Sequence, residues 1–242
     1  KVGDQAFCDG LNRVVIHQYT HQPDLDAKPG NQYFAGTHVD CNLTWWEPGR
    51  AWFQYLGRCQ YLLRQGVFQA DAVYFYGEGV TKFVPGREYL KPALPEGYNF
   101  DAINADILLH RLSVKNRHLI LPDGPSYSVL VLPEERVMSP NVLRKIKDLL
   151  DAGATVLGPR PLQTPGLKNY PRSDEELKEL ADGMWGADPR ESGERRIGQG
   201  RLFWGKDLAA VLAEINEQPD FEYKETRRNG STGAAELEFI HR

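Results

Sequence analysis

Residues 139–158, SPNVLRKIKDLLDAGATVLG, combine the signals of a helix, a turn and a buried strand. Ser139 suits the N-cap of a helix, and Pro140 suits its first turn, where a free amide hydrogen is not needed. Apolar residues then recur at the spacing of one buried helix face: Val142, Leu143, Ile146, Leu149 and Leu150. Gly153 is predicted to end the helix, and the apolar run 154–158 is predicted to be the next strand.

The same alternation continues on both sides of this stretch. Further strands are predicted at 71–77, 118–121, 127–132 and 201–204, and further helices at 101–112, 173–184 and 206–215. Ser173 and Glu176 have the spacing of a capping box at the start of the second of these helices. Apolar strands that alternate with helices indicate a parallel sheet covered on both faces. We therefore expect an α/β fold over residues 71–216, a doubly wound parallel-sheet domain of the flavodoxin or amidotransferase-like type.

The first 80 positions differ in composition from the rest, because they hold more than half of the chain's aromatic residues. The β-branched run 12–17 predicts a strand, residues 22–36 a loop, and residues 36–46 a second strand or an ordered loop. The apolar spacing of residues 51–65 predicts an amphipathic helix that ends at Gly66. A strand, a long loop and a helix are the succession found in a β/α unit.

Composition bounds the class of protein. The chain has 242 residues and a formal net charge of −4, without the clustered basic charge that nucleic-acid binding requires. Its apolar runs are shorter than the roughly 20 residues of a membrane span, so we expect a soluble protein without one. Cys8, Cys41 and Cys59 are expected to be free thiols. We expect both ends to be cut from a longer protein, and the alternating residues 236–242 to be a strand that needs partners.

Several other motifs do not by themselves indicate a function. Gly77-Glu78-Gly79 follows a strand but lacks the rest of the dinucleotide fingerprint, and the chain contains no Walker motif and no GxSxG nucleophile motif. His17 and His21 are four residues apart, but a strand followed by Pro23 removes the helical spacing that would make them metal ligands. The strand ends at Gly77, Pro133 and Gly158 are candidates for a ligand crevice by analogy of fold alone.

The densest group of functional residue types lies in residues 36–47, GTHVDCNLTWWE. Indole faces and short polar side chains together suit a sugar, whose C–H faces stack on aromatic rings while its hydroxyls need hydrogen-bond partners. Our candidates for substrate binding are His17, His38, Asn42, Trp45 and Trp46. Asp40 and Glu47 are weak catalytic candidates, since glycoside hydrolysis needs two carboxylates. The alternative is that both tryptophans pack against the adjoining helix and that both carboxylates have surface or hydrogen-bonding roles.

The chain resembles the α-L-rhamnosidases of glycoside hydrolase family 106. The resemblance rests on NRVVIHQYTHQP (12–23), PG (29–30), GTH (36–38), NLTWW (42–46), YLGRCQYLL (55–63), DAVYFYGE (71–78), GYNFDAINAD (97–106), LPDG (121–124), GATVLG (153–158), PDF (219–221) and FIHR (239–242). These motifs span the whole chain. One departure is Cys41-Asn42, where the family commonly has Arg-Asn before the Thr-Trp-Trp element.

The resemblance implies a large multidomain enzyme in which residues 1–70 end a catalytic (β/α) barrel, residues 71–216 form the α/β domain, and residues 217–242 lead into a β-sandwich. It implies hydrolysis of terminal α-L-rhamnose by inversion, with an acid and a base carboxylate upstream of Lys1, and calcium near the sugar in some members. The partner would be a rhamnose-containing oligosaccharide or glycoside. The compartment is left open between a periplasmic and an extracellular parent protein.

Two alternatives to this function remain. In the first, the α/β domain is a non-catalytic ligand-binding or oligomerisation module, and the aromatic residues before it only pack. In the second, the parent protein is another barrel glycosidase, similar to a β-galactosidase. The linkage, the aglycone and the oligomeric state are not indicated by the sequence.

Overall fold

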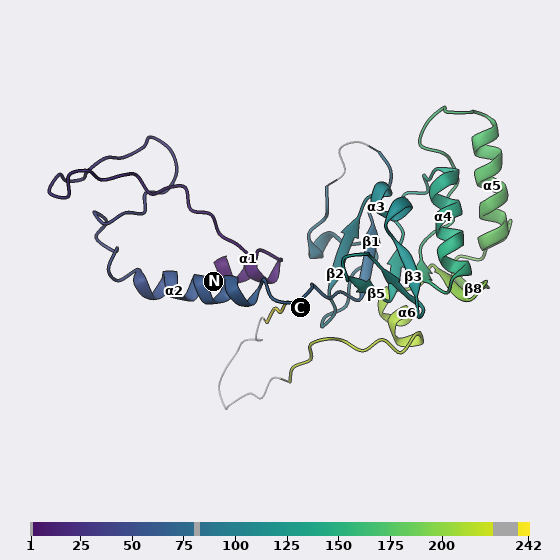
Figure 1. Ribbon diagram of the computed structural model, residues 1–242. Coiled ribbons are helices and arrows are strands. Elements are labelled where there is room, and N and C mark those ends of the chain that lie inside the picture. Colours follow the sequence, from purple (N-terminus) through teal and green to yellow (C-terminus); the bar gives the residue numbers. More distant parts are fainter. Residues whose placement is uncertain (1, 80–82, 225–236) are drawn as a thin grey trace. The chain divides into compact units, whose positions relative to one another are not determined.

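The computed structural model describes residues 2–79, 83–224 and 237–242 (Figure 1). The chain divides into two units. Unit 1 contains Lys1–Val67, Glu236–Ile240 and Arg242, and unit 2 contains Phe68–Ala235 and His241. Among the described residues, no helix has the length and apolar character that crossing a lipid bilayer requires.

Unit 2 is built on a six-stranded sheet with the order β2-β1-β6-β7-β9-β8. Its strands are β1 (Ala72–Phe75), β2 (Phe100–Ile103), β6 (Val129–Val131), β7 (Thr155–Leu157), β8 (Gly193–Ile197) and β9 (Gly200–Trp204). All neighbouring pairs are parallel except β8 and β9, which are antiparallel. The predicted parallel sheet is therefore present. The sequence did not predict β8, because its residues GERRI have no apolar pattern. β8 lies at the edge of the sheet, where a strand does not need one.

Alternate residues of the central strands face two apolar layers, so both faces of the sheet are covered. Val73, Leu130, Val156 and Leu202 pack in one cluster with α3 (Ala105–His110), α4 (Pro140–Asp151) and α5 (Arg172–Trp185). Ala72, Val129, Val131 and Phe203 pack in the other with α6 (Leu208–Glu214). α4 and α5 lie side by side (Figure 1).

The predicted helix at 139–152 has the expected end and the expected buried face. The Ser139 side chain accepts a hydrogen bond from the Val142 amide at 3.4 Å, and Val142, Leu143, Ile146, Leu149 and Leu150 are all buried. The capping box predicted at Ser173 and Glu176 is wrong. α5 begins at Arg172 after Pro171, and Ser173 is buried inside its first turn, where its hydroxyl has no hydrogen-bond partner among the described residues.

Other predicted elements have different bounds or different partner strands in the structure. The predicted helix 101–112 was wrong over its first residues, because Phe100–Ile103 pairs with β1 as β2 and only Ala105–His110 is helical, capped by the Asn104 side chain. The predicted strands 118–121 and 127–132 are only partly in the main sheet. β4 (His118–Ile120) pairs with β3 (Ser113–Lys115) and β5 (Ser126–Tyr127) in a separate antiparallel sheet. The short helix η1 (Arg87–Tyr89) completes the unit.

Unit 1 contains two helices, α1 (Val2–Cys8) and α2 (Arg50–Leu62), joined by a long ordered loop (purple to blue in Figure 1). The helix predicted at 51–65 is confirmed as α2, and the Tyr55 hydroxyl donates to Asp4 of α1 at 2.5 Å. The strand predicted at 12–17 is wrong. Val15 is 85% exposed and the Val14 amide donates to the side chain of Gln60 instead of to another strand.

The other strand expectations of this unit also fail among the described residues. Residues 36–46 form turns, which agrees with the alternative of an ordered loop, and residues 237–242 form no strand. Because residues 2–67 and 237–242 contain no strand, unit 1 does not by itself form a β/α unit. Its assignment to the end of a barrel, and that of residues 217–242 to a sandwich, stay predictions.

Candidate functional site

Two segments of the unit 1 loop are held together through their backbones at His17. The Thr37 amide donates to the His17 carbonyl at 2.8 Å, and the amides of Gln18 and Val39 complete the ladder by donating to Thr37 and Gln18. Gly36 makes this approach feasible, because a Cβ there would lie 2.3 Å from Nδ1 of His17 and its φ is +85°. The two halves of the predicted site, 12–23 and 36–47, therefore meet at this point.

His17 and His38 have different surroundings. His17 is exposed, and its ring meets Tyr33 edge to face with 6.1 Å between centroids. His38 is half-buried, and its Nδ1 is shielded from water without a hydrogen-bond partner among the described residues. A shielded ring nitrogen without a partner is costly, and this cost marks His38 as an unsatisfied polar group in the loop.

Asn42 anchors the loop that precedes it. Its amide nitrogen donates to the Pro29 carbonyl at 3.1 Å and to the Gln22 side chain at 3.4 Å, and its oxygen accepts from Nζ of Lys28 at 2.5 Å. The buried Gln22 also forms two hydrogen bonds with the backbone of Asn31. The side chain of Asn42 is thus already engaged in positioning residues 22–31, a role that the sequence pattern did not indicate.

The two candidate carboxylates are not arranged as a pair. Asp40 is only 2% exposed and its Oδ1 accepts from the Asn42 amide at 2.8 Å, which makes it part of the turn 40–43. Glu47 is exposed, and its carboxylate has no hydrogen bond or ion pair within the described residues. The structure gives Asp40 a local structural contact and leaves Glu47 open to solvent.

Trp45 and Trp46 pack on the same ring of α2 but differ in exposure. Both approach Phe53, with centroid separations of 6.3 Å for Trp45 and 6.2 Å for Trp46. Trp46 is half-buried and also contacts Tyr19 at 6.1 Å, which connects it to the segment that carries His17. Trp45 is 39% exposed. Of the two indoles, Trp45 has more surface available for stacking on a sugar.

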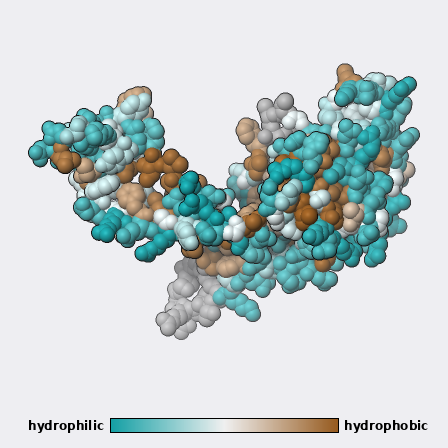
Figure 2. Space-filling model, in the orientation of Figure 1, coloured by the Kyte–Doolittle hydropathy of each residue, from teal (hydrophilic) through white to brown (hydrophobic). Residues whose placement is uncertain are grey.

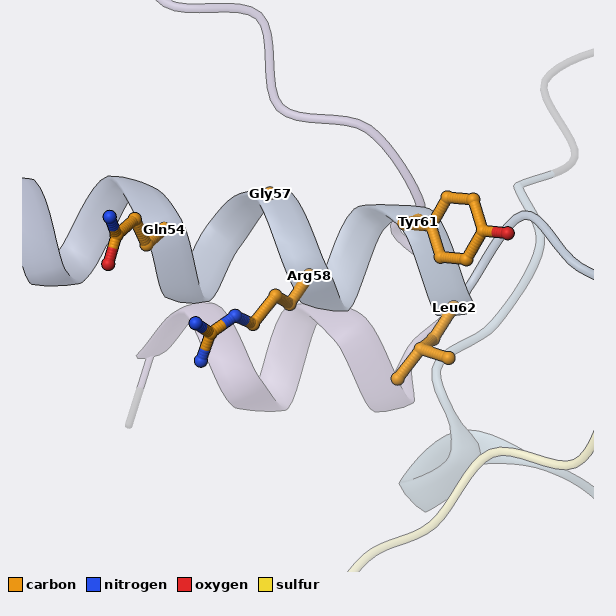
Figure 3. Close-up of a pocket in the computed structure, with 5 residues that line it drawn as sticks. All are labelled: Gln54, Gly57, Arg58, Tyr61 and Leu62. Carbon is orange, nitrogen blue, oxygen red and sulfur yellow. The ribbon is translucent and has the colours of Figure 1, made fainter.

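A hollow of about 580 Å³ lies over α2 and is lined by Gln54, Gly57, Arg58, Tyr61 and Leu62 (Figure 3). All five residues belong to one helix, and a Cβ at Gly57 would meet no atom within 4 Å. A ligand there would be contacted from one side only, unlike the enclosed clefts that bind small molecules. The hollow contains none of the predicted site residues, and we do not assign it as the site.

Unit 1 exposes much of its apolar surface, and Figure 2 shows a brown area on this unit beside teal surface. Phe7, Val39 and Leu56 are its buried apolar residues among those described. The exposed large apolar residues include Val15, Tyr19, Tyr33, Phe34, Trp45, Trp52, Tyr55, Tyr61 and Leu62. Extensive exposed apolar surface marks sites of interaction with other protein or with ligands.

The whole chain matches the alpha-L-rhamnosidases of glycoside hydrolase family 106, over residues 1–242. The chain belongs to this family. A solved structure of a rhamnosidase from Novosphingobium sp. PP1Y is similar to it with a TM-score of 0.77 and 30% sequence identity, over 93% of this chain and 21% of that one.

A protein of Formosa agariphila, provisionally named a beta-glucuronidase, is 38% identical to this family 106 chain over 187 residues. The match covers 76% of the chain and 16% of that protein. The chain thus spans less than a quarter of the length of either relative. Where the resemblance leads us to expect an arginine, the family 106 chain has Cys41, which is an exposed free thiol 4.0 Å from Oδ1 of Asn42.

In unit 2 of this family 106 chain, the carboxyl edge of β1 is occupied by the protein's own carboxylate. Glu78 follows β1, and its carboxylate accepts from the Ser139 amide at the start of α4 at 2.6 Å. The start of a helix favours negative charge, and ligands of doubly wound folds often bind at such a position. Because Glu78 fills it, the crevice hypothesis for Gly77 and Pro133 gains no support from this helix.

The opposite edge of the sheet carries a buried carboxyl group at Asp71. Burial is the main cause that raises the pKa of Asp71 to about 6; nearby Asp220 and Glu217 also raise it, while the hydrogen bond from the Asn99 amide lowers it. That hydrogen bond is 2.7 Å long. Ser128 donates to Glu217 at 2.5 Å, and the ring of His241 contacts Asp220 at 2.7 Å.

Replacing Asp71 with asparagine should raise the melting temperature of the chain at pH 7.5 and change it much less at pH 4. The folded pKa lies above the ordinary value, so the folded state holds a proton that the unfolded chain releases, and stability falls as pH rises from about 4 to 6. Asparagine keeps an oxygen that accepts from the Asn99 amide without the charge. Thermal unfolding at both pH values, with the exposed Asp188→Asn as control, measures the difference. An equal change in melting temperature at both pH values would contradict the raised pKa of Asp71.

Proposed function

We propose that the chain is part of a glycoside hydrolase that removes terminal α-L-rhamnosyl residues by an inverting mechanism. The observation that carries this proposal is the similarity to a solved rhamnosidase over 93% of the chain at 30% identity, together with the family match. In an inverting enzyme, one carboxylic acid protonates the leaving oxygen while a carboxylate activates water. We place both groups outside this chain, because Asp40 and Glu47 do not form a pair.

Unit 1 then serves as the closing part of the catalytic barrel. Its exposed apolar residues support this interpretation, since α2 presents Trp52, Tyr55, Tyr61 and Leu62 to solvent while burying Leu56 alone. Such a helix is stabilised by further protein packed on it. The described residues contain no group of three or more His, Cys, Asp or Glu that could hold a metal ion. No step of the proposed reaction is assigned to calcium here.

The loop of unit 1 forms the rim of the sugar site in this proposal. Trp45 offers an exposed indole face for the C–H surface of a sugar ring. His17 is exposed in the same loop, and Nδ1 of His38 has no hydrogen-bond partner among the described residues. Asn42 contributes to substrate binding by holding residues 22–31, and Trp46 by holding Trp45 and the His17 segment through Phe53 and Tyr19.

Replacing Trp45 with alanine in the full-length enzyme should raise KM for an aryl α-L-rhamnoside by about tenfold, because stacking on an aromatic face is lost. Tyr89→Ala is the control: Tyr89 is an aromatic residue of η1 in unit 2, is 71% exposed and is not part of the proposed rim. Steady-state kinetics and melting temperatures of both variants are the measurement. If Trp45→Ala lowers stability but leaves KM and kcat unchanged, Trp45 is a packing residue and the rim is assigned wrongly.

A substrate panel on the full-length enzyme tests the specificity itself. The name of the Formosa agariphila relative favours a β-glucuronide as the second candidate substrate. Aryl α-L-rhamnoside, β-D-glucuronide and β-D-galactoside differ only in the sugar, so their relative kcat/KM values separate the candidates. A rhamnoside turned over more slowly than either of the others would overturn the proposal.

A further inference from the structure

A cavity of about 410 Å³ lies in unit 2 where β7 and β9 end, far in sequence from the residues of the sugar rim. Its lining includes Pro159 and Arg160, which follow β7, and Trp204 and Gly205 at the end of β9. Ligands of open α/β sheets bind outside the carboxyl ends of the strands. The cavity has this location and a volume in the range of small-molecule sites, about 300–1,000 Å³.

The walls of the cavity are built by specific contacts. Trp185 is buried, and its indole N–H donates to the Gly158 carbonyl at 3.1 Å. Trp204 donates to the Arg190 carbonyl at 2.9 Å, which fixes the segment that crosses the cavity. The segment lies so close that a Cβ at Gly205 would be 2.1 Å from the Glu191 carbonyl oxygen.

Arginine side chains line this cavity and offer hydrogen-bond donors and positive charge. Arg160 pairs with Asp182, yet its Nε is shielded from water and has no hydrogen-bond acceptor among the described residues. Arg136 and Arg190 are exposed on the lining, and neither guanidinium has an ion-pair partner in the described part of the chain. A shielded donor without a partner calls for an acceptor, and a carboxylate suits arginine because it accepts two parallel N–H bonds.

The same lining contains groups that suit a sugar. Asp188 and Glu191 are carboxylates able to accept from hydroxyls, and Trp204 is a half-exposed indole. These two carboxylates repel any anion, but they accept hydrogen bonds from hydroxyls, which a bare inorganic anion lacks. A ligand with both a negative group and several hydroxyls satisfies the arginines, the carboxylates and the indole together.

We propose that this cavity binds an acidic sugar residue, with its carboxylate on the arginines and its hydroxyls toward Asp188 and Glu191. The cavity is lined by residues of unit 2 alone, and its binding of an acidic sugar does not depend on the hydrolytic activity proposed above. That this acidic sugar is a residue of a rhamnose-containing oligosaccharide rests on the proposed function, whereas the binding itself does not.

In the test, each ligand is titrated into the 242-residue chain. Binding is measured by calorimetry and by NMR of the arginine Nε–H groups. D-Glucuronate and D-galacturonate are compared with D-glucose and D-galactose, which lack only the carboxylate, and with sodium sulfate. We expect at least one uronate to bind about tenfold more tightly than its neutral counterpart and than sulfate, and to shift the Arg160 Nε–H signal.

Matched variants locate the binding. Arg136→Gln with Arg190→Gln removes two unpaired guanidinium groups and should weaken uronate binding at least about tenfold. Arg195→Gln with Arg196→Gln removes the same charge from the exposed edge strand β8 and should change it less than about twofold. All four side chains are exposed, so equal melting temperatures are expected.

Three outcomes would overturn the proposal. They are neutral sugars binding as tightly as the uronates, sulfate binding as tightly as the uronates, and the β8 variant losing as much affinity as the cavity variant. A fourth such outcome is that neither D-glucuronate nor D-galacturonate binds. None of these results bears on rhamnoside hydrolysis, so the outcome is independent of the proposed function.

Discussion

Gly200→Ala should lower the free energy of unfolding of unit 2 by at least about 3 kcal/mol, because overpacking against backbone has no cheap relief. Gly200 begins β9 and is buried. A Cβ there would lie 2.3 Å from the Ala154 carbonyl oxygen and 2.5 Å from that of Leu150. Both atoms are fixed, one before β7 and the other in the last turn of α4. Urea unfolding followed by far-UV circular dichroism measures the change.

Gly183→Ala is the control for this prediction. Gly183 lies in α5, and a Cβ there would meet no atom within 4 Å. Alanine in place of an unobstructed helical glycine is expected to raise the free energy of unfolding by about 0.5–1 kcal/mol. The two variants add the same methyl group and should therefore change stability in opposite directions. If Gly200→Ala unfolds at the same urea concentration as the unmodified chain, the close packing of β9 on α4 is wrong.

The 242-residue chain should release no measurable rhamnose from an aryl α-L-rhamnoside, whereas the full-length enzyme should. Inverting hydrolysis needs an acid and a base on opposite faces of the sugar. Asp40 is buried in a turn with its Oδ1 accepting from the Asn42 amide, and Glu47 has no group in the described residues to orient it. Release of the aglycone, measured at equal molar concentrations of both proteins, is the test.

Turnover of the rhamnoside by the 242-residue chain would have to come from a carboxylate within it. If the 242-residue chain turns over the rhamnoside and Glu47→Gln abolishes the turnover, the chain contains a catalytic carboxylate and our placement of both carboxylates elsewhere is wrong. Glu217→Gln is a suitable control, since Glu217 contacts Ser128 in unit 2.

The sequence predicted unit 2 well where local signals and packing agree. Residues 139–158 contain a cap, an apolar helix face, a terminating glycine and an apolar strand, and each of these is present. Residues 100–103 could not be assigned in this way, because FDAI becomes a strand only through its pairing with β1. The pairing of β3 with β4 could not be predicted for the same reason, because the pairing of short strands is not encoded in their composition.

Unit 1 was predicted less well because its long loop is held by contacts between segments that are distant in sequence. The run 12–17 has β-branched residues, but in this unit it finds no partner strand, and Val14 bonds a side chain of α2 instead. The aromatic and polar composition of 36–47 pointed to Trp45 and Asn42 as candidates, yet it did not show that Asn42 holds Lys28 and Pro29. Contacts between distant loop segments cannot be inferred from one sequence.

The carboxylate of Glu78 on the first turn of α4 has a consequence for how unit 2 behaves in a cell. Proteins that complete a helix end with a bound phosphate or nucleotide gain stability in proportion to the logarithm of the ligand concentration. Here the anion is covalently part of the chain and is always present. The stability of this helix end is therefore independent of metabolite supply.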